Sequence, residues 1–365
     1  MRSSITDLDN SGTFSNNFDI NSSNSDNYNN QKEIVNKIII KYISSFIENL
    51  TVLCIQTSNL TKKYGSSLAV DGIDLEIKSG QVFGFLGPNG AGKSTVIKLL
   101  TTLMPPTKGE LTVLGIDAAK SPLEIRRKIG VVLQQPSYEM TLSVENALDK
   151  YGMMWDVDKK TRKERTEELL TSFGLQEIRK KKNDDLSIGQ RRRVQVAREF
   201  MHDMDLLFLD EPTVGLDPSA RRELLDFLKK QVKKTGLTIF YTTHVLSEAE
   251  YLCDNIAIIN KGKILAVDSP NELKNRFGSE KTIKINLPKT SLSITDLLSG
   301  IPDCKIELEP EPSITINSSN SEVVLMNVLK ILNENNITIN DLSAVPTNLE
   351  EIFLKVVSDS NEPNN

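Results

Sequence analysis

One stretch of the sequence decides the fold, and it reads Gly87-Pro88-Asn89-Gly90-Ala91-Gly92-Lys93-Ser94-Thr95. It matches the phosphate-loop pattern G-x-x-x-x-G-K-[ST] at every defined position. The apolar run before it, residues 81–86, predicts a short buried strand, and residues 95–100 predict the start of a helix. A strand, a glycine turn and a helix in this order direct backbone N–H groups toward bound phosphates. The stretch therefore predicts a nucleotide-binding α/β fold.

The residue types within residues 87–95 indicate separate roles. Glycines let the backbone close around an anion without Cβ clashes. Lys93 is expected to reach the β- and γ-phosphates, and the Ser94 hydroxyl is expected to bind Mg²⁺. We expect all nine residues of the stretch to line the nucleotide site.

The composition excludes several other classes of protein. The 365 residues suffice for one large domain and a smaller one. A formal net charge of −5 argues against a nucleic-acid-binding surface, which is usually basic. The 3 cysteines are far apart, so no disulfide framework or zinc site is predicted and a reducing compartment fits.

The N-terminal residues 1–52 have the weakest folding signal. Residues 1–32 are rich in Asn, Ser and Asp, which predicts disorder. Residues 33–50 have apolar side chains at helical spacing and predict an amphipathic helix, better suited to packing on the main domain than to a lipid surface. Polar and charged residues interrupt the most apolar stretch, 35–55, so no spanning helix is expected. The N-terminus, residues 1–4, leads into polar sequence and not into an apolar core, so no secretory signal is expected. Membrane contact would come through a partner.

Three further apolar runs end in polar side chains. The runs end at Leu133, Leu209 and Thr243, and each is expected to be a strand of a parallel sheet. Ligands of open α/β folds bind at the carboxyl edge of such strands. The polar residues that follow the runs are Gln134, Asp210, Glu211 and His244.

Position suggests a role for each acid and for the histidine. Asp210 is placed to hold Mg²⁺ through water, and Glu211 is placed to polarise a water molecule. A lone histidine is usually structural. His244 lies at a strand end beside the expected nucleotide, which favours contact with the γ-phosphate.

The rest of the chain predicts a main domain over residues 53–280 and a small α+β domain over 281–358, followed by a tail. The main domain begins with antiparallel strands at 53–59, 68–71 and 73–77 and contains a helix-rich block, about 121–204. Ser143 is expected to cap a helix that continues through Trp155. In the small domain we expect short strands, one of them at 337–339, and helices over 322–333 and through Val356.

In order and spacing, these motifs resemble the nucleotide-binding domain of the ATP-binding-cassette superfamily over residues 55–277. The resemblance implies a phosphate-loop ATPase fold with a mixed sheet core, an antiparallel β subdomain and a helical subdomain. It also implies that ATP is bound at the Walker A loop, residues 87–94. The other motifs are the Walker B end Leu209–Pro212 with catalytic Glu211, the Q-loop Gln134, the signature Leu186–Gln190, the D-loop with Asp217, the switch His244 and the adenine-stacking Tyr64.

Two of these motifs need comment. From position alone, Tyr64 could equally be a half-buried packing residue. The signature usually reads Leu-Ser-Gly-Gly-Gln, and here Ile188 replaces the first glycine. Ser187, Gly189 and Gln190 are retained, so contact with the γ-phosphate is implied, but a branched side chain lies beside the expected dimer interface.

Residues 214–218 and 348–353 resemble the drug-resistance type of exporter ATPase, a group related to lipid-transporting A-type cassettes. The resemblance implies an ATPase subunit that works as a head-to-tail dimer and couples hydrolysis to a separate transmembrane subunit, on the cytosolic face of a membrane. Glu211, His244 and Lys93 would be catalytic. Ser94, Gln134 and Asp210 would hold Mg²⁺.

Two alternatives remain open from the sequence. One is a soluble cassette ATPase that regulates or assembles a cytosolic complex, although translation-factor cassettes typically have two phosphate loops and this chain has one. The other is a degenerate cassette that binds ATP without useful turnover. The presence of Glu211 and His244 argues against that reading, and Ile188 keeps it open.

Overall fold

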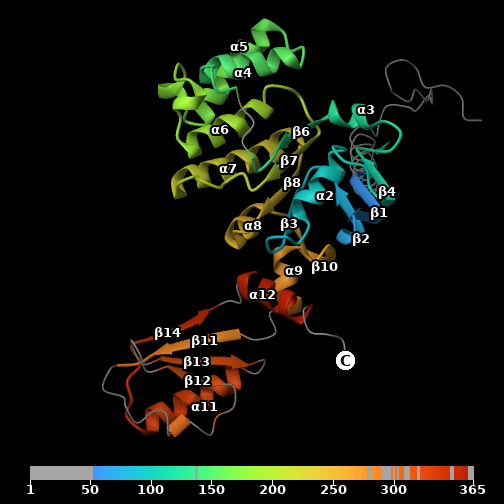
Figure 1. Ribbon diagram of the computed structural model, residues 1–365. Helices are drawn as coiled ribbons and strands as arrows, with labels where there is room; N and C mark the ends of the chain where they lie inside the picture. The colour runs from blue at the N-terminus through green and yellow to red at the C-terminus, as the bar shows by residue number, and fades with distance from the viewer. Residues whose placement is uncertain are drawn as a thin grey trace, which may run out of the picture. The chain divides into compact units, whose positions relative to one another are not determined.

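The computed structural model gives the fold of most of the chain after residue 51 (Figure 1). The described residues are 52–135, 139–277, 281–288, 297–298, 301, 304–307, 313–318, 321–345 and 349–360. The expectations for the disordered segment and amphipathic helix within residues 1–51, and for the end of the tail, lie outside the described residues.

A 6-stranded sheet with the order β10-β9-β3-β8-β7-β6 forms the centre of the ATPase part. Its strands are β3 (Val82–Leu86), β6 (Ile129–Val132), β7 (Leu206–Asp210), β8 (Thr238–Thr243), β9 (Asn255–Asn260) and β10 (Lys263–Asp268). All neighbours pair in parallel except β10, which forms an antiparallel hairpin with β9. Every residue of β3, β7 and β8 is buried. Parallel strands covered on both faces have continuous apolar sequences, which is why the apolar runs predicted them.

The central sheet separates two hydrophobic cores. Val82 and Leu86 of β3 belong to one core, whereas Phe83 and Phe85 belong to the other. This division follows from the alternation of side chains along a strand. The Phe240 ring lies at the centre of the second core, with ring centroids of neighbouring phenylalanines at 5.3 to 6.1 Å.

A 4-stranded antiparallel sheet with the order β2-β1-β4-β5 packs its apolar side chains into the second core. Its strands are β1 (Leu53–Tyr64), β2 (Ser67–Lys78), β4 (Lys108–Val113) and β5 (Ile116–Asp117). The expected strands at 68–71 and 73–77 are in fact one continuous strand, β2. Gly72 has φ of 66° and lies where the β1–β2 register is irregular. The strand accommodates this glycine as an irregularity, whereas the sequence predicted that the strand is interrupted there.

Helices cover both faces of the central sheet (Figure 1). They are α2 (Lys93–Leu100), α3 (Pro122–Arg126), α4 (Val144–Met154), α5 (Lys159–Ser172), α6 (Ile188–Glu199), α7 (Pro218–Thr235), α8 (Leu246–Leu252) and α9 (Pro270–Phe277). The Ser143 hydroxyl caps α4, accepting from the backbone N–H of Asn146 at 3.4 Å. The expected cap is therefore confirmed. Among the described residues, no helix combines the length and apolarity that a bilayer crossing requires.

The C-terminal part contains a second antiparallel sheet with the order β12-β13-β11-β14 and a helix, α11 (Ser321–Glu334). The strands are β11 (Lys281–Asn286), β12 (Cys304–Glu307), β13 (Ser313–Ser318) and β14 (Asp341–Val345). The strand predicted at 337–339 is wrong. Ile337 packs against the small core from a loop, and pairing with β11 begins at Asp341, opposite Asn286.

The last helix, α12 (Leu349–Asp359), packs into the ATPase part (Figure 1). Leu349, Ile352 and Val356 are buried within the first core, together with residues of α7 and α8. Their spacing places them on one face of the helix. The chain therefore returns to the ATPase core after the second sheet.

Candidate active site

The glycines of the phosphate loop are required by close packing. The loop joins Leu86 of β3 to Lys93 of α2. A Cβ at Gly87 would clash with the carbonyl oxygen of Ile259. Gly92 has φ of 111°, and a Cβ there would lie 2.5 Å from the Ala69 carbonyl oxygen. Neighbouring strands thus hold the loop in a shape that larger residues cannot adopt.

The Lys93 ammonium lies inside the loop. Its Nζ donates to the Gly87 carbonyl at 2.6 Å and to the Pro88 carbonyl at 3.3 Å, and the side chain is buried. Burial lowers the pKa of Lys93, and the carboxylates of Glu211 and Asp210 oppose that change.

A hydroxyl and a carboxylate meet beside the loop. Ser94 Oγ donates to Asp210 Oδ2 at 3.2 Å, and Thr242 Oγ1 donates to Asp210 Oδ1 at 2.6 Å. Asp210 ends β7, so the sheet positions its carboxylate against the first turn of α2. Hard oxygen atoms of this kind are the ligands that Mg²⁺ prefers.

Glu211 lies at the centre of a polar group of side chains. Its Oε2 accepts from Gln134 Nε2 at 3.3 Å, and its Oε1 lies 3.3 Å from His244 Nδ1. The backbone N–H of Glu211 donates to the Thr242 carbonyl at 3.1 Å. Glu211 is buried and has φ of 49°, which is uncommon for a residue other than glycine. Strained backbone of this kind is found at functional sites.

A cavity of about 260 Å³ is lined by two of the three predicted catalytic side chains, Glu211 and His244. Gln134, Glu211 and His244 line it together with the start of the phosphate loop, residues 87–89. The His244 side chain is 57% exposed, whereas Glu211 is nearly covered. The carboxyl edge of the sheet thus brings these predicted residues together.

Arg192 is a site residue that sequence reasoning missed. Its buried guanidinium donates to the carbonyls of Leu133 at 2.7 Å, Asp210 at 2.5 Å and Glu211 at 2.9 Å. Burial lowers its pKa to about 10, so it stays charged near neutral pH. It lies in a run of arginines, residues 191–193, and nothing in that pattern distinguishes it from its neighbours.

Glu248 is a second missed residue, and it fixes the loop that carries His244. Its Oε2 accepts from the hydroxyls of Thr213 at 2.9 Å, Tyr241 at 2.7 Å and Thr243 at 2.9 Å. The buried carboxylate therefore joins α8 to β8 and to the segment after Glu211. A glutamate four residues after a strand-end histidine gave no specific signal.

The signature residues lie apart from this cavity among the described residues. Ser187 and Gln190 form a capping box: Ser187 Oγ accepts from the Gln190 N–H at 3.2 Å, and Gln190 Oε1 accepts from the Ser187 N–H at 3.0 Å. A Cβ at Gly189 would lie 2.7 Å from the Gly215 carbonyl oxygen, so the start of α6 packs tightly on the D-loop. Ile188 is 68% exposed.

Tyr64 and Asp217 likewise have local partners in the described part of the chain. Tyr64 ends β1, is partly exposed, and donates from its hydroxyl to Met104 Sδ at 2.9 Å. Asp217 caps α7 by accepting from the Ala220 N–H at 3.0 Å, and that hydrogen bond lowers the pKa of Asp217.

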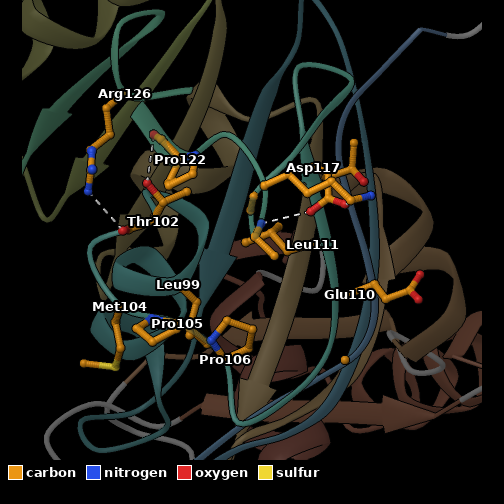
Figure 2. A pocket seen from close by; sticks show the side chains of 15 residues that line it. Leu99, Thr102, Met104, Pro105, Pro106, Glu110, Leu111, Asp117, Pro122 and Arg126 are labelled. Atoms are coloured by element: carbon orange, nitrogen blue, oxygen red, sulfur yellow. Dashed lines mark hydrogen bonds and ion pairs between the residues drawn. The ribbon is translucent and has the colours of Figure 1, made fainter. Parts of the chain in front are cut away.

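A separate cavity of about 660 Å³ lies between the end of α2, β4 and α3 (Figure 2). Figure 2 shows Arg126 reaching toward Thr102, and Arg126 Nη1 donates to the Thr102 carbonyl at 3.3 Å. The Thr102 hydroxyl donates to the Pro122 carbonyl at 3.3 Å. Of the described residues, those that line this cavity include none of the predicted site residues.

The sheet order, the buried loop lysine and the acid at the end of β7 are those of a phosphate-loop ATPase with a helical insertion. Comparison with known proteins agrees. The family described as ABC transporter matches residues 70–214. The chain is 35% identical over 305 residues to the linearmycin resistance ATP-binding protein LnrL of Bacillus subtilis (strain 168), covering 83% of this chain and 97% of that protein.

Other relatives and solved structures give the same result. Identity to the daunorubicin/doxorubicin resistance ATP-binding protein DrrA of Streptomyces peucetius is 35% over 301 residues, covering 82% of this chain and 91% of that protein. An ATP-binding subunit of an ABC transporter superposes with a TM-score of 0.57 and 27% identity, covering 62% of this chain and 93% of that one. The dimeric cassette MJ0796 bound to ADP and Pi superposes with a TM-score of 0.55 and 27% identity, covering 59% of this chain and 98% of that one.

The chain therefore belongs to the ABC transporter family and is an ATP-binding, ATP-hydrolysing subunit of a transporter. The fold class and family expected from the sequence are confirmed.

Proposed function

We propose that this chain is the ATPase subunit of a drug-resistance-type exporter, acting as an ATP-sandwich dimer on a separate transmembrane subunit. The observation that carries the proposal is the arrangement around Glu211, whose two carboxylate oxygens face Gln134 and His244 in one cavity beside the phosphate loop. Relatives named as resistance ATP-binding proteins support the exporter assignment. The site would then lie at the cytosolic face of a membrane, held there by the partner.

The residues present fit MgATP. The loop N–H groups and Lys93 suit the phosphates, and the partly exposed ring of Tyr64 suits the adenine. Ser94 Oγ, the Asp210 carboxylate and the Gln134 amide oxygen would hold Mg²⁺, which neutralises charge on the phosphates. Among the described residues, no three or more metal-binding side chains of the His, Cys, Asp and Glu types form a cluster.

The catalytic assignment follows from the positions of the charged groups. Glu211 would accept a proton from water as the water oxygen bonds to the γ-phosphorus. The bond to the bridging oxygen would break and leave ADP and phosphate. Lys93 and His244 would stabilise the negative charge on the transferred group.

The exposed N-terminus of α6 supports the proposal that the chain dimerises around ATP. The first N–H groups of a helix have no partner within that helix, and anions bind there readily. The capping box occupies the backbone N–H groups of Ser187 and Gln190, so the N–H groups of Ile188 and Gly189 are the donors of this turn that would meet ATP on a second copy. The solved structure of MJ0796, a structural relative, is dimeric and supports a dimer here.

The Glu211→Gln variant tests the catalytic assignment. We expect ATP hydrolysis to fall at least about 100-fold, because a carboxamide cannot accept the proton. ATP affinity should stay within about twofold, since phosphate contacts are unchanged, and MgATP should trap the dimer in size-exclusion chromatography. Glu223→Gln, at an exposed position on α7, is the matched control and should hydrolyse ATP at the parent rate. Hydrolysis at the parent rate by Glu211→Gln would show that another residue is the base.

The partner assignment is tested by affinity purification of the tagged chain from detergent-solubilised cells. A polytopic membrane protein in near-stoichiometric amount is the expected result. Recovery of soluble partners alone, with the chain absent from washed membranes, would instead favour a cassette ATPase of a cytosolic complex.

A further inference from the structure

The final helix reaches the catalytic cavity. Phe353 of α12 lines the same cavity of about 260 Å³ as Gln134, Glu211 and His244. Leu349 and Glu350, one turn earlier, line an adjoining cavity of about 470 Å³ that also includes His244 and Leu246. Two successive turns of α12 therefore border the segment that carries His244.

The position of α12 is fixed along its length. Leu349, Ile352 and Val356 are buried in the ATPase core. Lys355 Nζ donates to the Phe277 carbonyl at 3.3 Å, and Asn260 Nδ2 donates to Ser360 Oγ, just after the helix, at 2.9 Å. Phe353 and Leu246 both pack against this core as partly buried side chains. The aromatic ring is thus carried by a well-anchored helix.

His244 lies on an exposed connecting segment, so contacts from other elements are needed to hold its side chain in position. It lies between the end of β8 at Thr243 and the start of α8 at Leu246, and 57% of its side chain is exposed. Glu248 anchors α8 from the sheet side, through the Thr213, Tyr241 and Thr243 hydroxyls. Phe353 borders the same cavity as His244 and Leu246, and a ring with two side-chain torsions loses little conformational entropy when fixed.

We propose that Phe353 is a positioning residue for ATP hydrolysis. It holds the segment from His244 to Leu246 so that His244 Nδ1 stays 3.3 Å from Glu211 Oε1. Through α12, the polypeptide that follows the second sheet becomes part of the ATPase site. This inference rests on the proposed roles of His244 and Glu211.

Steady-state phosphate release by the full-length chain with MgATP tests the inference. We expect Phe353→Ala to lower kcat about tenfold while the KM for ATP stays within about twofold, because a displaced catalytic group slows the step without removing phosphate contacts. Phe353→Leu, which restores most of the apolar side-chain surface bordering the cavity, should recover at least about half of the parent kcat. Leu354→Ala is the matched control, since Leu354 is the next residue of α12 and is 61% exposed.

The outcomes separate this inference from the proposed function. If Phe353→Ala has the same kcat as the parent chain while Glu211→Gln is inactive, the positioning role is overturned and the catalytic assignment stays intact. Parental rates for both variants would instead reject the catalytic assignment. Equal losses of kcat, ATP affinity and melting temperature in Phe353→Ala and Phe353→Leu would show a merely structural role and overturn the inference. A loss of kcat alone, rescued by leucine and absent in Leu354→Ala, supports it.

Discussion

At the scale of single residues, the site depends on one buried cation that links two motifs. Arg192 lies on α6 behind the signature turn, and its guanidinium bonds to the backbone of Leu133, Asp210 and Glu211. It thereby joins the start of the Q-loop to the end of β7. Because the carbonyl groups of Asp210 and Glu211 accept hydrogen bonds from the Arg192 guanidinium, they hold Glu211 in its uncommon backbone conformation, with φ of 49°.

Replacing Arg192 with lysine should therefore weaken both stability and catalysis. A lysine cannot supply the fork of donors, so we expect a loss of about 2 kcal/mol in the free energy of unfolding. We also expect kcat to fall about tenfold because Glu211 is less well held. Arg193→Lys is the control, because the Arg193 guanidinium donates to the Phe173 carbonyl, away from the cavity. Urea unfolding and phosphate release measure the two effects, and equal behaviour of the two variants would contradict the assignment.

A second residue-scale prediction concerns acid stability. His202 is buried, its ring stacks on Trp155 with centroids 3.9 Å apart, and burial lowers its pKa from 6.5 to about 4. Between pH 6.5 and 4 the unfolded chain binds more protons than the folded chain at this residue, so lowering the pH destabilises the fold. The contribution reaches about 3 kcal/mol near pH 4.

Urea unfolding at pH 7 and at pH 4.5 measures this contribution. His202→Gln should remove that part of the pH dependence, because glutamine does not titrate in this range. His244→Gln, at an exposed position, should keep it. An unchanged pH dependence in His202→Gln would contradict the prediction.

At the scale of elements, helix α6 contributes to the site through its first two turns. Its first turn packs on the D-loop, while Arg192 in its second turn contacts the carboxyl edge of the sheet. A Cβ at Gly215 would lie 2.8 Å from Ile188 Cγ2, so the unusual signature residue is fitted to its own D-loop. Its exposed side chain still lies on the turn that would face a second copy.

Ile188→Gly should therefore tighten the nucleotide-dependent dimer. Removing the branched side chain lets the α6 N-terminus approach the opposing phosphate more closely, and we expect the dimer Kd to fall about fivefold in a Glu211→Gln background with MgATP. Ile188→Ala separates this effect from helix propensity, because alanine favours helix and glycine costs about 1 kcal/mol. Analytical ultracentrifugation gives the Kd, and an equal or weaker dimer in both variants would contradict the expectation.

At the scale of the whole molecule, the chain forms two structures with separate cores and then returns to the first. The second sheet and α11 have their own core around Ile285 and Val328, whereas α12 completes the ATPase core with Ile352. Shortening a buried side chain in the ATPase core should therefore have a different effect from shortening one in the core of the second sheet.

We expect Ile352→Ala to lower the stability of the ATPase part by about 2–5 kcal/mol, because it leaves a cavity in that core. The unfolding transition that MgATP stabilises should shift with it, since ligand binding stabilises the part that binds. Val328→Ala should leave that transition and kcat unchanged. Calorimetry with and without MgATP distinguishes the two parts, and equal shifts in both variants would contradict this division.

The sequence by itself determined the family and the central strands, and it predicted the principal residues of the candidate site. Phosphate-loop chemistry depends on adjacent residues, and buried parallel strands leave continuous apolar runs, so both are readable along the chain. The edge of the sheet then had to bring Gln134, Glu211 and His244 together. Gly72 and the loop at 337–339 were misread because strand limits depend on partners distant in the sequence.

Only the tertiary structure decided which arginine of the run 191–193 reaches Glu211, that Glu248 anchors the His244 segment, and that Phe353 lines the cavity beside Glu211. A side chain's neighbours across the molecule are selected by how the helices pack, and packing leaves no local pattern. The last helix shows this most clearly. The helix itself was predicted from the sequence, but the core that it completes belongs to a sheet whose strands lie much earlier in the chain.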